Sequence, residues 1–391
     1  MKLEGGDARP NAPMRVSPPD FRRHVHCLLG VPIDMVDTND ALARIRAAAV
    51  ARIPCFVSTP NLNFLIACGT DAAFRDAVIQ SDLSVADGMP LVWIARLLGM
   101  PIRERVAGST LFEALRADAA RPLSVYFFGG PAGAAEAACR RLNEEKRGLR
   151  CAGFHYPGMG DVEAMSADPV IAAINASGAD FLVVALGARK GQAWIVRNLT
   201  RLRVPVVSHL GAVVNFVAGS VGRAPAWVQE AGLEWLWRIK EEPGLWRRYA
   251  GDGLALVRLL TTRVLPHAIH LRRHRRRFAN RPDPKMDRTS HQGVLMLRLQ
   301  GDWGNDQLEP LRREFAAAAA TAREVWLDLG NVSQIDSAFV GLVLLLFGWQ
   351  TKMGMRPNFV AVSPAARRVF RYCCAEFVLE GGSSPGSGAI A

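Results

Sequence analysis

The sequence lacks three features that would assign it quickly to a class. No uncharged apolar run reaches the ~18 residues of a membrane-spanning helix, and the longest candidate, residues 338–349, is too short. The seven cysteines show no CxxC or paired spacing, so we expect reduced thiols in a cytoplasmic protein. Asp-x-Asp is absent and no His/Cys cluster has metal-ligand spacing, so we expect no bound metal.

Length and terminal composition set the outline of the chain. Its 391 residues exceed one ordinary core, so we expect two domains. Residues 1–22 contain Gly, Pro, Asp and Glu without an apolar core, which predicts disorder and not a signal peptide. Residues 384–391 are predicted to be a loose tail.

The net charge of +12 is concentrated in one segment. Residues 247–278 contain nine arginines and one acid, Asp252, which indicates an anionic partner. An apolar stripe at near-helical spacing, interrupted by Pro266, leads into the arginine run and consists of Val257, Leu260, Val264, Ala268 and Leu271. We therefore interpret residues 251–280 as a basic amphipathic segment on an anionic membrane surface. The alternatives are a solvated face and a nucleic-acid-binding segment, although the aromatic interleaving typical of the latter is missing.

Strand-like and helix-like patterns alternate between residues 31 and 209. The clearest buried strands are residues 123–128 and 180–186. This alternation predicts a Rossmann-like α/β domain over residues 23–250, with a parallel sheet and helices on both faces. We expect a polar, proline-containing linker at residues 281–292 and a small second α/β domain at residues 293–383.

Residues 56–88 form the predicted reaction centre. Two short apolar runs end in polar groups, the first at Thr59, Asn61 and Asn63 and the second at Asp87. In a parallel sheet such ends lie side by side at the carboxyl edge, where ligands bind. Asp87 is the best-placed general base, because it needs only to reach an acceptor hydroxyl. An Asp-Gly pair is also a common turn, but the polar neighbours of Asp87 favour a functional role.

Two further features offer phosphate binding. Gly129 and Gly130 lie between a strand and a helix, where a turn can cradle a diphosphate at the helix N-terminus. Four arginines could neutralise the rest of the negative charge of such a diphosphate: Arg223, Arg238, Arg247 and Arg248. Both features also have an explanation without a ligand. The two glycines could simply form a tight turn, and the arginines could be solvated surface charges.

In chain order, the sequence carries Thr59-Pro60-Asn61, Asp87-Gly88, Arg105-Val106-Ala107-Gly108-Ser109, Phe128-Gly129-Gly130, Arg223-Ala224-Pro225, Gly232-Leu233-Glu234-Trp235, and Arg238 with Glu242-Pro243. Together these motifs resemble the WecG/TagA/CpsF family of bacterial glycosyltransferases, over about residues 27–249. The resemblance implies an inverting, metal-independent transfer of a sugar from a UDP-sugar to a polyprenyl-diphosphate-linked saccharide. Such reactions serve the synthesis of teichoic acid, surface antigens or exopolysaccharide.

The resemblance also implies roles for single residues. Asp87 would be the catalytic base and Thr59 would assist it. The implied substrate-binding residues are Asn61, Asn63, Arg105, Gly129, Gly130, Gln192, Arg223, Glu234, Arg238, Arg247 and Arg248. Departures from the family pattern at residues 189–192, Asn215 and Gly244 leave the donor sugar open.

The second domain resembles a STAS domain through Leu327-Asp328-Leu329, Val332, Ile335-Asp336-Ser337, Ser363-Pro364 and Val369-Phe370. Regulatory members of that family are phosphorylated at the second serine of Asp-Ser-Ser-Gly, and here Ala338 occupies this position. We therefore expect a separately folded STAS-like domain that docks a protein partner or a second copy and is not a kinase switch.

The predicted protein is thus a hexosyl- or N-acetylhexosaminyl-type glycosyltransferase, cytoplasmic and peripheral on the inner face of the cell membrane. It would use a UDP-sugar as donor substrate, with no further cofactor and no nucleic-acid partner. The alternative is a catalytically silent protein that senses a nucleotide-sugar and signals through its STAS-like domain.

Overall fold

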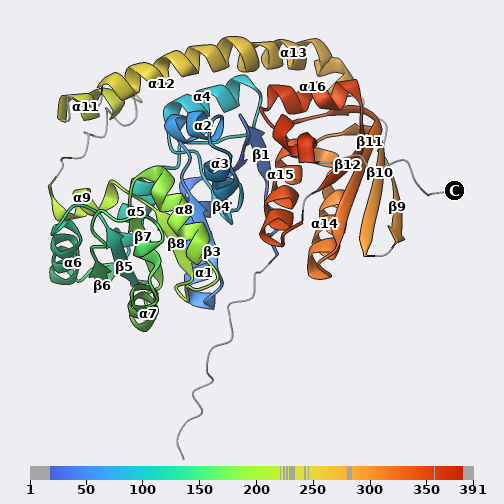
Figure 1. Ribbon diagram of the computed structural model, residues 1–391. Helices are drawn as coiled ribbons and strands as arrows, with labels where there is room; N and C mark the ends of the chain where they lie inside the picture. Colours follow the sequence, from blue (N-terminus) through green and yellow to red (C-terminus); the bar gives the residue numbers. More distant parts are fainter. Residues whose placement is uncertain are drawn as a thin grey trace, which may run out of the picture.

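The computed structural model describes most of residues 18–381 (Figure 1). Outside the description lie residues 1–17, 221, 223–224, 226–227, 229–233, 242–243, 245, 280–283, 292, 356 and 382–391, together with the side chains of residues 238, 241, 248, 274–279 and 381. The predicted tail at residues 384–391 and most of the predicted disordered N-terminus therefore lie outside the described residues.

The described part begins with a hairpin that the sequence analysis missed in part. Strand β1 (Val25–Leu28) pairs antiparallel with β2 (Val31–Asp34), and only β2 was predicted. Leu29 and Gly30 connect them with φ of 50° and 90°, as a tight two-residue hairpin turn requires. The prediction of disorder was wrong for Phe21, whose side chain is 2% exposed and whose ring lies 5.7 Å from that of Phe315.

Six parallel strands form the central sheet, in the order β4-β3-β8-β7-β5-β6. They are β3 (Cys55–Ser58), β4 (Leu83–Ser84), β5 (Leu123–Gly129), β6 (Leu149–His155), β7 (Phe181–Ala185) and β8 (Val206–His209). Because strands buried on both faces carry nearly continuous apolar residues, β5 and β7 are buried along their whole length. This sheet confirms the predicted Rossmann-like architecture.

Helices cover both faces of the sheet. One face packs against α1 (Thr38–Ala51), α5 (Gly108–Ala117), α6 (Ala134–Glu145) and α9 (Val213–Ala218). The other face packs against α7 (Asp168–Ala176) and α8 (Ala188–Asn198). A third apolar cluster lies among α2 (Leu62–Cys68), α3 (Ala72–Ile79) and α4 (Met89–Leu97), next to the β2 strand of the hairpin.

A long helical segment crosses the top of the molecule in Figure 1. It comprises α11 (Glu234–Glu241), α12 (Trp246–Leu259) and α13 (Leu265–Ala279), and a π-helical turn, Leu260–Val264, joins α12 to α13. Pro266 was expected to interrupt this segment. Proline cannot donate the i→i−4 hydrogen bond, and the wider turn before it lets the helix continue.

The apolar stripe of this segment faces the protein, not the solvent. Val264 and Ala268 are 1% and 6% exposed, and Leu260 and Leu271 pack on the same cluster as α2, α3 and α4. Of the predicted stripe, only Val257 is largely exposed, at 56%. The prediction that this stripe is free to enter a membrane was therefore wrong.

The C-terminal domain is a four-stranded sheet with helices, in the order β12-β11-β10-β9. Its elements are β9 (Lys285–His291), β10 (Val294–Trp303), α14 (Glu309–Ala320), β11 (Glu324–Ile335), α15 (Ser337–Lys352), β12 (Asn358–Val362) and α16 (Pro364–Tyr372). Strand β9 pairs antiparallel with β10 along its whole length. The predicted linker was therefore wrong for residues 285–291, whose polar side chains suit an exposed edge strand.

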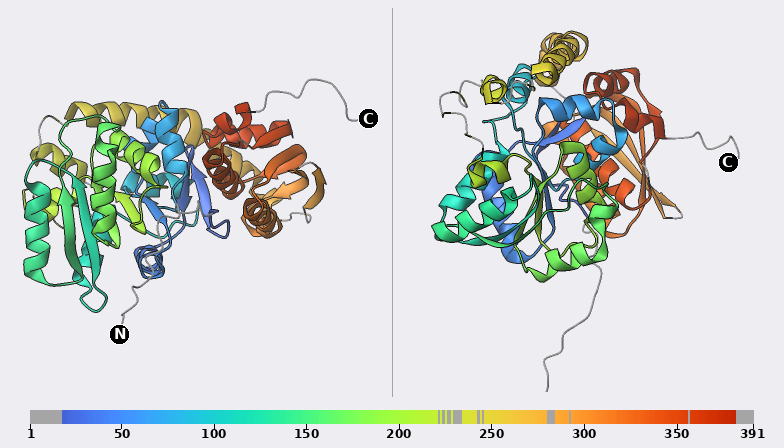
Figure 2. Two further views of the ribbon diagram at one scale, coloured as in Figure 1. Left: turned by 60° about the horizontal axis from the view of Figure 1, so that its bottom comes forward. Right: turned by 60° about the vertical axis from the view of Figure 1, so that its left-hand side comes forward.

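The two domains lie side by side in Figure 2. They share one hydrophobic core. Helix α15 packs on β1, β2 and α3, and Phe21, Val25, Cys27 and Ile79 belong to the same buried cluster as the C-terminal domain. A Cβ on Gly341 would lie 2.9 Å from the Val25 carbonyl oxygen, so only glycine permits this approach. The prediction of a separate core for the second domain was wrong.

Polar contacts reinforce this interface. The His26 Nδ1 lies 2.9 Å from the Ser337 hydroxyl, and burial lowers the pKa of His26. Arg312 donates to the carbonyl oxygens of Phe21 and Arg23, at 2.6 and 2.7 Å. The first residue of α15 and a side chain of α14 are thus part of the domain contact.

The expectation of reduced cysteines was also wrong for one pair. Cys139 on α6 and Cys151 on β6 form a disulfide, with their Cα atoms 5.0 Å apart. Their separation of 12 residues spans the turn from the helix to the strand, which brings the strand back beside the helix. The cysteines described as free are Cys27, Cys55, Cys68, Cys373 and Cys374.

Candidate functional site

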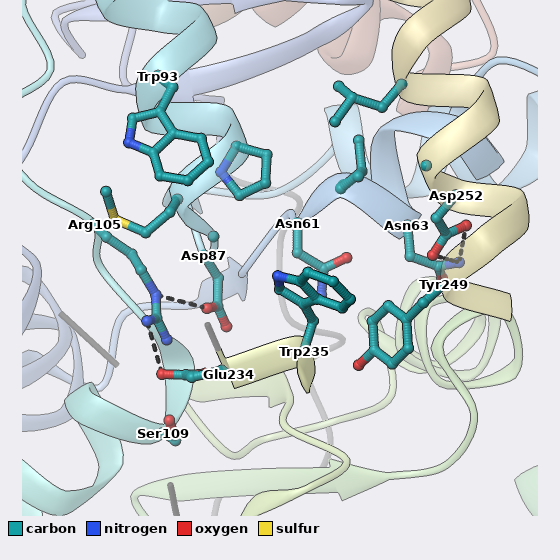
Figure 3. Close-up of a pocket in the computed structure, with 16 residues that line it drawn as sticks. Asn61, Asn63, Asp87, Trp93, Arg105, Ser109, Glu234, Trp235, Tyr249 and Asp252 are labelled. Atoms are coloured by element: carbon teal, nitrogen blue, oxygen red, sulfur yellow. Dashed lines mark hydrogen bonds and ion pairs between the residues drawn. The ribbon is translucent and has the colours of Figure 1, made fainter. Parts of the chain in front are cut away.

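A cavity of about 410 Å³ lies between the carboxyl edge of the sheet, at β3 and β4, and the helices α11 and α12 (Figure 3). Its lining comes from the loops and helices after β3 and β4, from the start of α5, and from the long helical segment. The lining residues are Asn61, Leu62, Asn63, Asp87, Gly88, Met89, Pro90, Trp93, Arg105, Ser109, Glu234, Trp235, Tyr249, Asp252, Gly253 and Leu256.

Asp87 lies in this cavity, in the loop between β4 and α4. Its Oδ2 accepts a hydrogen bond from the Gly108 backbone N–H at 3.2 Å, in the first turn of α5. Its Oδ1 lies 3.6 Å from the Arg105 Nε, and its side chain is 25% exposed. A helix N-terminus and a guanidinium both attract negative charge, so these contacts fix the carboxylate while leaving part of it open to the cavity.

Arg105 links the two sequence-predicted acids of the site. It donates to Glu234 Oε1 at 2.8 Å and contacts Asp87 from its other side, as the dashed lines in Figure 3 indicate. Burial alone would lower the pKa of Arg105, but Glu234 and Asp87 outweigh burial and raise that pKa. Arg105 is therefore a fixed cation between two carboxylates, and α11 is tied to the sheet edge through it.

Thr59 lies behind Asp87 rather than on the cavity surface. It is 7% exposed, at the end of β3. A Cβ on Gly108 would lie 3.1 Å from the Thr59 Cγ2 and 3.4 Å from its Oγ1, so the hydroxyl adjoins the backbone that holds Asp87. The structure thus brings Thr59 and Asp87 to the two sides of Gly108.

Asn61 and Asn63 stand at the start of α2 and line the cavity. Asn61 is the N-cap of α2, and its Oδ1 accepts from the Phe64 backbone N–H at 3.2 Å, a contact that orders the loop after β3. The Asn63 Nδ2 donates to both carboxylate oxygens of Asp252, at 3.4 and 3.5 Å. Asn63 therefore connects the sheet edge to α12.

Other residues implied by the family resemblance lie elsewhere. Gln192 is fully buried on α8. Its Nε2 lies 3.4 Å from the hydroxyl of Ser58, the residue that precedes Thr59 in the sequence. Gly129 is the last residue of β5 and Gly130 follows it, and the strands β7 and β8 separate β5 from β3. A Cβ on Gly129 would lie 2.8 Å from the Ala185 carbonyl oxygen, so close packing on β7 already requires glycine there.

Of the four arginines predicted to bind phosphate, only Arg247 has a side chain among the described residues. Arg247 is exposed on α12, with its guanidinium carbon 5.7 Å from the centre of the Trp246 ring. It is not among the residues that line the cavity. Arg223 and the side chains of Arg238 and Arg248 lie outside the described residues.

Sequence reasoning missed several lining residues, above all Trp93, Tyr249 and Asp252. Trp235 belongs to a sequence motif but not to the predicted site residues, and its ring lies 6.3 Å from that of Tyr249. Asp252 enters the sequence analysis only as the single acid among nine arginines. That imbalance was the one available signal, because an isolated acid in a basic helix suggests a position that does not face the anionic partner.

Within the described part of the chain, no group of three or more His, Cys, Asp and Glu side chains is arranged to hold a metal ion. Among the same residues, no helix has the length and apolar character needed to cross a membrane.

Two family models match this chain. A family model described as "Glycosyl transferase WecG/TagA/CpsF family" matches residues 26–268, which include the described cavity lining. A second model, described as "Mlab, STAS domain", matches residues 286–375.

Similar curated proteins bear the name N-acetylglucosaminyldiphosphoundecaprenol N-acetyl-beta-D-mannosaminyltransferase. That of Bacillus spizizenii (strain ATCC 23059 / NRRL B-14472 / W23) is 27% identical over 49% of this chain and 74% of its own length. That of Bacillus subtilis (strain 168) is 26% identical over 50% of this chain and 75% of its own length. That of Staphylococcus aureus (strain MW2) is 25% identical over 56% of this chain and 85% of its own length.

Proposed function

Because the chain belongs to the WecG/TagA/CpsF glycosyltransferase family, we propose that it transfers a sugar, of N-acetylhexosaminyl or other hexosyl type, from a UDP-sugar to a polyprenyl-diphosphate-linked saccharide. The relatives are named for the transfer of N-acetylmannosamine to an N-acetylglucosaminyl-diphosphoundecaprenol. The observation that carries the proposal is Asp87, which is oriented by Gly108 and Arg105 at the base of a cavity of about 410 Å³.

In the proposed reaction the Asp87 carboxylate removes the proton of an acceptor hydroxyl. The acceptor oxygen forms a bond to the anomeric carbon of the donor, and the bond from that carbon to the UDP oxygen breaks. A single displacement of this kind inverts the anomeric carbon, and UDP leaves with the bonding electron pair. Thr59 supports the loop that holds Asp87, and Asn61 orients a substrate sugar.

The charge of the leaving UDP needs positive partners. The Gly129–Gly130 turn and Arg223, Arg238, Arg247 and Arg248 remain the proposed groups for this task. We propose that no resident metal or further cofactor takes part, because the sequence offers no Asp-x-Asp and no evident ligand set.

We also propose that the protein works at the inner face of the cell membrane, through a surface that shares only Val257 with the predicted stripe. Four apolar side chains lie on the solvent side of α12 and α13, three, eight and four residues apart: Leu254, Val257, Leu265 and Ile269, with exposures of 74%, 56%, 46% and 49%. We call these four the outer row. Trp93 and Leu97 on the neighbouring α4 are 53% and 42% exposed, and Arg258, Arg272 and Arg273 are exposed beside the row.

This arrangement suits a lipid-linked acceptor. Trp93 and Leu256 belong to both the cavity lining and the helices that carry the exposed apolar residues. A helix with apolar and basic residues on one outward side binds at the interface of an anionic bilayer. The cavity would then open toward the leaflet that carries the polyprenyl chain.

The direct test measures UDP release from the full-length chain with a panel of UDP-sugars and a short-chain prenyl-diphosphate-N-acetylglucosamine acceptor. We expect Asp87→Asn to slow transfer by about two to four orders of magnitude, because it removes the base but keeps the shape. Asp168→Asn, at a side chain that is 96% exposed on α7, is the matched control and should transfer normally.

Near-normal turnover by Asp87→Asn, with a wild-type unfolding temperature, would contradict the role of Asp87. Binding of a nucleotide-sugar without UDP release by the wild-type protein would instead favour the silent sensor. A protein partner or a second copy would have to use a surface of the STAS domain other than α15, in which 14 of 16 residues are buried.

A further inference from the structure

Asp252 is a buried acid that no step of the proposed reaction uses. It lies on α12 and is 9% exposed, in a helix whose other charged residues are exposed to solvent where they are described. Among the described residues, its side-chain hydrogen bonds come from the Asn63 Nδ2, at the long distances of 3.4 and 3.5 Å. No ion pair among the described residues includes it. A carboxylate offers about four acceptor positions, so Asp252 retains capacity for further donors.

The surroundings of Asp252 suit a sugar ring. Tyr249 lies one helical turn earlier on α12, and its ring is 6.3 Å from that of Trp235 across the cavity wall (Figure 3). Aromatic faces pack well on the C–H faces of a pyranose, while a carboxylate accepts from its hydroxyl groups. A mainly apolar lining with a few placed polar groups is typical of small-ligand sites.

The charge of the cavity argues against a diphosphate at this end. The described lining contains three acids, Asp87, Glu234 and Asp252, and one cation, Arg105, which already contacts two of them. Three negative charges against one positive leave a net charge of −2, which favours a neutral sugar ring at this end over the diphosphate group that either substrate carries. Neutral hydroxyl and amide N–H donors gain from the same field.

We propose that Asp252, steadied by Asn63, accepts hydrogen bonds from hydroxyl or amide groups of the acceptor sugar and so sets acceptor specificity. The inference rests on the proposed transferase function and adds a substrate contact to it. The acceptor is favoured over the donor because Asp252 is carried by the helix that also carries the outer row. A lipid-linked saccharide that enters from that side meets α12 before it reaches Asp87.

The test separates binding of the acceptor from chemistry. Asp252→Asn keeps the side-chain shape and an oxygen that can accept from Asn63, but removes the charge. Hydrogen bonds to charged groups are among the stronger ones, so we expect the KM for the short-chain prenyl-diphosphate-N-acetylglucosamine acceptor to rise about 10- to 100-fold. The KM for the UDP-sugar and the unfolding temperature should stay near the wild-type values.

A set of acceptors that each lack one ring hydroxyl, or the N-acetyl group, identifies the contact. A site built around a hydroxyl strongly rejects an analogue without it, so one analogue should bind wild-type protein much more weakly than the parent. In Asp252→Asn the difference in affinity between the parent acceptor and this one analogue should shrink. The variant and the analogue each remove one side of the same hydrogen bond, so their effects should not add. Asn63→Ala should show a smaller shift in the same direction, and Asp168→Asn should show none.

Acceptor binding is also measured by equilibrium titration without donor, so the result does not depend on turnover. If the wild-type protein binds the parent acceptor but transfers no sugar, the proposed function fails and the binding comparison still tests Asp252. An unchanged acceptor affinity in Asp252→Asn, or equal discrimination among the analogues, overturns the inference. A lowered unfolding temperature with unchanged discrimination would assign Asp252 a purely structural role.

Discussion

Two helical segments of this protein are rich in apolar residues, and their surroundings are opposite. Helix α15 is buried along residues 337–350, between the C-terminal sheet and the β1–β2 hairpin. The α12–α13 segment is buried on one side only and leaves the outer row and several arginines in solvent. The more apolar helix is thus internal, and the mixed one forms the surface.

The difference teaches that apolar content does not identify what a helix contacts. Helix α15 has too few residues to span a bilayer, but its all-round apolar character fits complete burial. The α12–α13 segment carries two apolar faces, one for the protein and one for the solvent side. The sequence pattern revealed a stripe but not which of its residues the protein itself would cover.

Deletion of residues 289–391 should have the largest effect. It removes α15 and exposes Phe21, Val25, Cys27 and Ile79, which share its core. We expect the truncated protein to be insoluble or to lose its cooperative unfolding transition, measured by circular dichroism on heating. A soluble truncation with the wild-type unfolding temperature would show that the catalytic domain does not need α15, and would remove the contrast between the two segments.

Replacing the outer row with serine should leave the fold intact but abolish vesicle binding. The four side chains are 46–74% exposed, and full burial of such a residue is worth about 1.5–3 kcal/mol, so we expect binding to weaken at least about 100-fold. The measurement is co-sedimentation with vesicles that contain anionic lipid. Val50→Ser, at an exposed valine on α1, is the control, since α1 lies on the opposite side of the sheet domain in Figure 1.

The arginines test the same surface with a smaller effect. Arg272→Gln with Arg273→Gln should weaken binding about 10- to 30-fold, at about 1 kcal/mol for each charge, and should reduce its salt dependence. Binding that ignores lipid charge and both sets of substitutions would mean that α12 and α13 do not face a membrane.

Two glycines offer the smallest and sharpest comparison. Gly341→Ala places a Cβ 2.9 Å from the Val25 carbonyl oxygen and 3.1 Å from the Cys27 amide nitrogen, so we expect a loss of about 1–3 kcal/mol. Gly251→Ala, in the exposed part of α12, meets nothing within 4 Å and should stabilise the protein by about 0.5–1 kcal/mol. Chemical denaturation measures the change in the free energy of unfolding for both variants. A change of the same sign in both would contradict the packing described for the two glycines.

The sequence predicted the catalytic half of the fold because buried parallel strands and their helices leave a local pattern. Asp87, Asn61 and Asn63 could be placed for the same reason, since each lies within a few residues of the end of a short strand. Asp252 and Tyr249 could not, because their position depends on how α12 packs across the sheet edge. Strand β9 was missed because an exposed edge strand of polar residues resembles a linker.

The interface between the two domains could not be predicted from local sequence patterns either. Val25 and its neighbours form a four-residue run, too short to show a period, and their partner is a helix at the other end of the chain. The Cys139–Cys151 disulfide likewise depends on a helix and a strand that lie side by side. Its separation of 12 residues matches none of the usual cysteine motifs, so the sequence did not predict it.

The contact between His26 and Ser337 has a consequence for how this protein is made. The two residues are 311 positions apart, so at about 5–20 residues per second a ribosome needs about 15–60 s to produce the second after the first. During that interval the apolar side of the β1–β2 hairpin has no α15 to cover it. The first strands of the chain therefore complete their packing only after translation has passed residue 352, and until then their apolar side chains are exposed on an aggregation-prone intermediate.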